Sequence, residues 1–92
     1  MIIDFFILYF RFVLNSNQTI LYPNPTNGIV NLKSNDLIHK TIVYDLNGRR
    51  LQTIPSNSTN QQTIDFSKFL SGMYVLELQT GKGKFIHKVM KN

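Results

Sequence analysis

Apolar and polar residues alternate along most of this chain, in short runs that turn-forming residues separate. The segment 41–46 shows the pattern clearly, because successive residues fall alternately on an apolar and a more polar face. Asn47-Gly48 follows directly, a pair that favours the tight turn of a β-hairpin, and residues 49–54 supply the returning strand. The pattern predicts strands, and no part of the folded region has apolar residues at helical spacing.

Further strands are predicted at intervals of about eight to twelve residues. They lie at 29–33, 62–66, 73–78 and 84–90, with 19–22 as an additional one. Ser34-Asn35-Asp36 is expected to end the first, residues 55–60 to form a polar loop, and Gly81-Lys82-Gly83 to make the last turn. The most apolar segment, 73–78, is expected to be central. Six to seven strands of this kind predict an all-β protein with an immunoglobulin-like antiparallel β-sandwich.

Residues 66–74 resemble a corner found in such sandwiches. Phe66, Leu70 and Tyr74 have the spacing at which a tyrosine early in a core strand bonds back to the upstream backbone.

The stretch 22–28 (Tyr-Pro-Asn-Pro-Thr-Asn-Gly) carries two prolines one residue apart. Each proline fixes φ and lacks an amide donor, so this stretch is predicted to be neither helix nor interior strand. Asn27-Gly28 tolerates positive φ and is expected to reverse the chain there. The predicted result is a stiff turn that leads into the strand beginning at Ile29.

Residues 1–18 differ from the rest. The run 2–14 is very apolar but contains Asp4 and Arg11, and it is shorter than the roughly twenty residues of a membrane-spanning helix. It also lacks a basic start and an A-x-A-like cleavage site, which makes it a poor secretory signal. A degenerate signal, an added strand and truncated upstream sequence all remain open. We divide the chain into this segment with its polar linker (1–18) and one domain (19–92).

Composition adds a charge asymmetry. The 92 residues include 10 basic and 5 acidic side chains, a net charge of +5, and no cysteine. Disulfides, thiolate metal sites and thiol nucleophiles are therefore excluded. Four lysines occupy the last eleven residues: Lys82, Lys84, Lys88 and Lys91. They either present a face to an anionic partner or keep an edge strand soluble.

No constellation for catalysis is recognisable. His39 and His87 lie 48 residues apart in the sequence without acidic residues at ligand spacing beside them. His87 is expected to be exposed on the last strand. The acids are dispersed, no Gly-x-Ser-x-Gly motif occurs, and the aromatic residues alternate with the core pattern and form no exposed stacking row. We therefore expect no enzyme activity, no cofactor or metal, no nucleic-acid partner and no small-molecule substrate.

Four motifs follow one another in residues 20–92. They are 21–28 (Leu-Tyr-Pro-Asn-Pro-Thr-Asn-Gly), 42–49 (Ile-Val-Tyr-Asp-Leu-Asn-Gly-Arg), 64–67 with 70–76, and Lys88 near the terminus. Together they resemble the C-terminal sorting domain of type IX secretion cargo, in the type A form of the Por secretion system. Each motif alone is weak, but four in family-like order and spacing are specific.

This resemblance implies a non-catalytic secretion signal domain that targets an attached cargo. Family members reach the periplasm by an ordinary signal peptide, and an outer-membrane translocon then recognises the sandwich and moves the attached cargo to the cell surface. A sortase-like cysteine peptidase removes the domain and often joins the cargo to anionic lipopolysaccharide. The implied location is the periplasm, in transit to the surface or the medium, for a chain with a functional signal peptide.

Two sets of residues are predicted to matter. The candidate recognition residues are Pro23, Asn24, Pro25, Gly28, Lys82, Lys84, Lys88 and Lys91, and the structural motif residues are Asp45, Gly48, Gly72 and Tyr74. The alternative is an immunoglobulin-like adhesion or carbohydrate-binding module of a surface protein, which predicts exposed aromatic side chains on one sheet.

Overall fold

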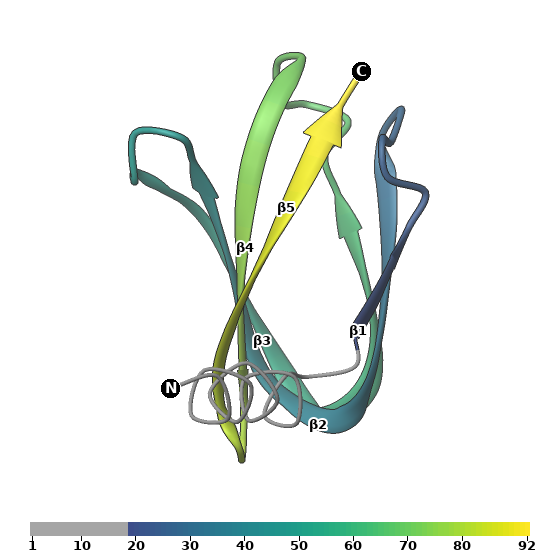
Figure 1. Ribbon diagram of the computed structural model, residues 1–92, viewed down its shortest axis with the longest axis vertical. Coiled ribbons are helices and arrows are strands. Elements are labelled where there is room, and N and C mark those ends of the chain that lie inside the picture. Colours follow the sequence, from purple (N-terminus) through teal and green to yellow (C-terminus); the bar gives the residue numbers. More distant parts are fainter. Residues whose placement is uncertain (1–18) are drawn as a thin grey trace, which may run out of the picture.

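The computed structural model describes residues 19–92, and the three interpretations of the N-terminal segment lie outside the described residues. The described part forms one antiparallel sheet of five strands (Figure 1). The strands are β1 (Thr19–Tyr22), β2 (Ile29–Asp45), β3 (Arg50–Asp65), β4 (Gly72–Thr80) and β5 (Gly83–Lys91). The predicted all-β antiparallel fold is confirmed.

The two longest strands, β2 and β3, each cover two segments that the sequence predicts as separate strands. Ser34-Asn35-Asp36 does not end a strand, and residues 55–60 are not a loop, because β2 and β3 continue through them. The pairing register between these strands shifts between Lys33 and Ile38 and again before Lys40. Bulges of this kind bend a strand sharply without ending it, and turn-forming residues fit them well.

Because β2 and β3 bend, the sheet folds over into two facing halves, visible as two limbs in Figure 1. In one half the first part of β2 pairs with β1 and with the end of β3. In the other half the second part of β2 pairs with the start of β3 and with β4, which in turn pairs with β5. Seven strand segments thus form a sandwich of three and four, and β4 has a neighbour on each side, as the sequence predicts.

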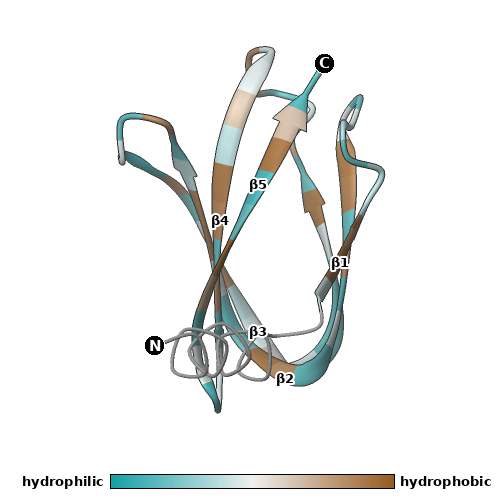
Figure 2. Ribbon diagram, in the orientation of Figure 1, coloured by the Kyte–Doolittle hydropathy of each residue, from teal (hydrophilic) through white to brown (hydrophobic). Residues whose placement is uncertain are grey.

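The hydrophobic core lies between the two halves. Its buried side chains come from both: Val30, Leu32, Ile38, Val43, Ile64, Phe66, Tyr74, Leu76, Leu78 and Val89. Along β4 buried and half-buried residues alternate, and Figure 2 shows apolar and polar bands alternating along the strands. Burying each large side chain contributes about 1.5–3 kcal/mol, so this shared core holds the two halves together.

Candidate recognition surface

The proline turn, residues 23–28, is organised by a side chain that the sequence analysis did not single out. Thr26 is fully buried, and its hydroxyl donates to the Ile29 carbonyl at 2.7 Å while accepting from the Gly28 N–H at 3.0 Å. Gly28 has no positive φ, so the predicted reversal by a left-handed Asn27-Gly28 pair is wrong. The threonine hydroxyl closes the turn instead, and a Thr followed two residues later by Gly is a sequence signal for this geometry.

Asn24 connects this turn to the last strand across 64 residues of sequence. Its side-chain amide donates to the Lys88 carbonyl at 3.0 Å and accepts from the Met90 N–H at 3.0 Å. A neighbouring strand would offer the same donor and acceptor through its peptide groups. One exposed side chain therefore takes the place of a short piece of strand along the edge of β5.

The backbone of Thr26 continues this pairing. Its N–H donates to the Met90 carbonyl and its carbonyl accepts from the Asn92 N–H, both at 2.9 Å, in a parallel bridge. The Asn92 side chain also donates to Asn27 at 3.0 Å. The proline turn and residues 88–92 therefore form one continuous surface, which we call the composite surface.

The predicted recognition residues divide between two ends of the molecule. Pro23, Asn24 and Pro25 are exposed, and they lie with Lys88 and Lys91 on the composite surface. Lys82 and Lys84 lie at the opposite end of β5, which rises about 3.3 Å per residue and so places Lys84 roughly 23 Å from Lys91. The four lysines do not form one cluster.

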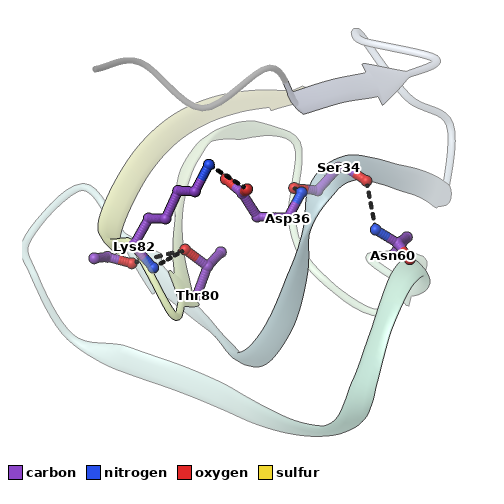
Figure 3. A network of polar contacts seen from close by, with 6 residues as sticks. Ser34, Asp36, Asn60, Thr80 and Lys82 are labelled. Carbon is purple, nitrogen blue, oxygen red and sulfur yellow. Dashed lines mark hydrogen bonds and ion pairs between the residues drawn. The ribbon is translucent and has the colours of Figure 1, made fainter. Parts of the chain in front are cut away.

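Lys82 has a structural contact of its own. Its ammonium group lies 3.4 Å from an Asp36 carboxylate oxygen, which joins the turn between β4 and β5 to the bend in β2 (Figure 3). The Lys82 N–H donates to the Thr80 hydroxyl, and the Asn60 amide donates to the Ser34 carbonyl in the same region. This network supports the bend that turns one sheet into two halves.

The motif residues Asp45 and Gly48 build the hairpin between β2 and β3. Gly48 has a φ of +84°, which favours glycine. The Asp45 carboxylate accepts from the N–H groups of Arg49 and Asn47, both at 2.9 Å, and forms an ion pair with the Arg49 side chain. The Arg49 N–H is the largest cause that lowers the pKa of Asp45, so the aspartate stays charged and locks the turn.

The tyrosine corner, residues 66–74, has the contact that the sequence predicts. The Tyr74 hydroxyl donates to the Leu70 carbonyl at 2.6 Å, and the Tyr74 ring meets Phe66 edge-on at 5.5 Å between centroids. Gly72 has a φ of +145°, which a residue with a side chain rarely adopts. A groove of about 410 Å³ between this corner and the Asp45 turn is lined mainly by apolar side chains, including Leu46 and Met73.

His87 differs from its expected placement. It pairs with Leu76 in the register of β5 and β4, so its side chain lies on the core face of the sheet and is half-buried. Its Nε2 atom is buried without a hydrogen-bond partner, and loss of solvation lowers its pKa. The prediction of an exposed position is wrong, because Phe85 and Ile86 are both apolar and leave the inward face of β5 ambiguous.

Within residues 19–92, no group of three or more His, Cys, Asp or Glu side chains is placed to hold a metal ion. The same residues include no helix long and apolar enough to cross a membrane.

Comparison with known proteins gives one clear result. The family model described as "Secretion system C-terminal sorting domain" matches residues 20–92, which is nearly all of the described chain. A search of curated proteins found no match. The matched region begins just before the proline turn and ends with β5, so it includes both parts of the composite surface. The chain belongs to the family of C-terminal sorting domains of the type IX secretion system.

Proposed function

We propose that residues 19–92 direct an attached cargo to the type IX translocon at the outer membrane and are then removed by a sortase-like peptidase. Membership of the family implies that its cargo passes through the periplasm to the cell surface or the medium. The joining of the released cargo to anionic lipopolysaccharide is part of the same proposal. In this proposal the domain itself performs no catalysis.

The observation that carries the proposal is the composite surface. Asn24 and Thr26 fix the proline turn to residues 88–92 by hydrogen bonds that span more than sixty residues of sequence. A receptor can therefore read a turn and a strand end as one rigid epitope, and binding does not require these groups to become ordered first. The exposed Lys88 and the half-buried Lys91 give this surface a positive charge that favours an anionic partner.

The test is a secretion assay in a bacterium with a working type IX system. A fluorescent reporter with a competent signal peptide is fused to residues 19–92, and a second fusion carries Asn24→Ala and Lys88→Glu. We expect processed reporter at the surface or in the medium for the first fusion, and folded reporter retained in the periplasm for the second. Lys33→Glu, an exposed charge change on the other half of the sandwich, is the matched control and should leave delivery unchanged.

Failure of the unaltered fusion to leave the periplasm, despite a folded domain, would contradict the proposal and favour the adhesion or carbohydrate-binding alternative. That alternative requires exposed aromatic side chains on one sheet. Among residues 19–92, Tyr22 is the one aromatic residue in the set of exposed large apolar side chains. The peptidase step is checked separately, by mass spectrometry of the reporter's new C-terminus.

A further inference from the structure

The composite surface covers only part of the outer edge of β5. We infer that the uncovered part, from Lys84 to the N–H of Lys88, takes an extended segment of a partner protein as an added β-strand, and that the residues on one face of this segment (every second residue) are alternately acidic and apolar. The inference goes beyond the sorting function, because it concerns the backbone groups of β5 that the proline turn leaves unpaired and a defined chemistry of the partner.

The backbone geometry of β5 carries the first step. Lys88 directs its carbonyl, and Met90 both its N–H and carbonyl, away from β4 toward the proline turn. In an antiparallel ladder a residue directs both backbone groups to the same side, and the side alternates along the strand. Lys84 and Ile86 therefore also direct their N–H and carbonyl groups to this outer edge, as does the Lys88 N–H.

No strand within residues 19–92 pairs with that edge. β5 pairs with β4 along its length, and its other strand contact is the bridge between Thr26 and Lys91 at its far end. Unpaired edge groups of this kind are a ready template for an added strand. The proline turn already shows how the edge is paired where it is covered, through Asn24 and Thr26.

The side chains along this stretch define the partner. Lys84, Ile86 and Lys88 lie on the outer face of the sheet, and Ile86 is 59% exposed between the two lysines. An edge strand protected only against aggregation does not require a large exposed apolar residue at its centre. Directly opposed residues on added strands interact, so this row favours acidic, apolar and acidic side chains in alternation.

A second copy of this chain fits the row poorly. If two β5 strands paired antiparallel about Ile86, Lys84 of one copy would lie opposite Lys88 of the other, which is unfavourable. No two of the five acidic residues of the sequence lie four positions apart, the spacing that would place acids on one strand opposite both Lys84 and Lys88. The charge of the edge thus points to a different protein.

The test uses the full 92-residue chain, labelled with ¹⁵N, and two synthetic seven-residue peptides. The first is Thr-Glu-Thr-Val-Thr-Glu-Thr with blocked ends, and the second has lysine in place of both glutamates. We expect the acidic peptide to slow hydrogen exchange at the Lys84, Ile86 and Lys88 amides. Phe85 and His87 should change little, because their amides already face β4. The basic peptide should bind about tenfold more weakly or worse.

Two variants separate the edge from general loss of fold. Ile86→Pro removes an N–H that faces away from β4, a position where edge strands tolerate proline, and it should abolish binding while the near-ultraviolet circular dichroism is retained. The double variant Lys84→Glu with Lys88→Glu should reverse the preference, so that the basic peptide binds more tightly than the acidic one. Lys33→Glu is the matched charge control and should preserve the original preference.

Three results would overturn the inference. The first is protection of the edge amides before any peptide is added. The second is equal binding of the two peptides. The third is a preference for the acidic peptide that survives the double charge reversal. Because peptide binding is measured in solution, failure here leaves the secretion assay unaffected, and failure of secretion leaves the peptide result standing.

Discussion

The tyrosine corner and the proline turn both redirect the chain between strands, but different groups hold them. At the corner, Phe66 is fully buried and its ring lies within 5.5 Å of both Phe69 and Tyr74, measured between centroids. At the turn, Asn24 is exposed and is attached to β5 by hydrogen bonds that water can replace. The corner depends on burial, whereas much of the turn depends on exposed polar contacts.

This difference separates what the fold needs from what a partner can read. A buried aromatic cluster stabilises the sandwich but presents little surface to a receptor. An exposed side-chain hydrogen bond contributes only about 0.5–1.5 kcal/mol, yet it fixes the position of the groups around it. We therefore expect changes at the corner to act on stability first, and changes at Asn24 to act on recognition first.

Phe66→Ala should have the largest effect on stability. It removes a fully buried ring from the core and leaves a cavity, which costs about 3–5 kcal/mol. A small domain of this type has a total stability of about 5–15 kcal/mol, so urea unfolding should shift strongly or the chain should fail to fold. Leu70→Ala, at a side chain that is 83% exposed in the same corner, is the control and should change the midpoint little.

Tyr74→Phe should have an intermediate effect, because it keeps the ring and removes only the hydroxyl. The lost bond to the Leu70 carbonyl should lower the free energy of unfolding by about 1–2 kcal/mol. Chemical denaturation measures it, and the fusion assay should still deliver this variant to the surface. Loss of delivery by a folded Tyr74→Phe domain would mean that the corner is itself recognised. That result would contradict the division between a corner that serves stability and a turn that serves recognition.

Asn24→Ala should have the opposite balance of effects from Tyr74→Phe, with a small loss of stability and a large loss of delivery. The unfolding free energy should fall by about 1 kcal/mol, while surface delivery of the reporter falls further than for Tyr74→Phe. Asn35→Ala, an exposed asparagine on β2, is the matched control and should affect neither quantity. Equal delivery by the Asn24 and Asn35 variants would show that the turn only sets the position of its strands.

Local signals in the sequence account for much of the fold. Alternation and Asn47-Gly48 predict the hairpin between β2 and β3, and the spacing of Phe66, Leu70 and Tyr74 predicts the corner. Each of these features depends on residues close together in the chain. The continuous course of β2 is not predicted. Its turn-forming residues are locally indistinguishable from a strand end, and the pairing partner that keeps them extended lies in β3.

The candidate recognition surface is predictable only in its parts. Asn24 and Lys88 can each be singled out from the sequence, but their contact spans 64 positions and no local pattern specifies it. The C-terminal lysines are close in sequence, yet the extended geometry of β5 separates Lys84 from Lys91. Lys82 lies in the turn before β5 and forms an ion pair with Asp36. Long-range pairing, which composition and periodicity do not encode, decides which residues meet.

The smallest expected effect is a pH dependence that originates in β5. Loss of solvation holds the pKa of His87 below its ordinary value of 6.5, whereas the unfolded chain titrates near that value. As pH falls below 6.5, the unfolded state takes up the proton first, so stability is lost until the folded pKa is reached. The lowered pKa of Asp45, ordinarily 3.8, adds a separate loss only at more acidic pH.

Urea unfolding between pH 8 and pH 5 measures the histidine contribution, and His87→Gln should flatten the curve in that range. His39→Gln removes an exposed histidine from β2 and should retain the slope of the unaltered chain. Because His87 lies on the strand that carries the composite surface, hydrogen exchange at the Met90 amide should quicken on acidification, after correction for intrinsic rates, before exchange at Phe69 in the corner. Equal acceleration at both amides would mean that the turn and the corner unfold as one unit. The two regions would then differ only in the surface that they present to a partner, not in local stability.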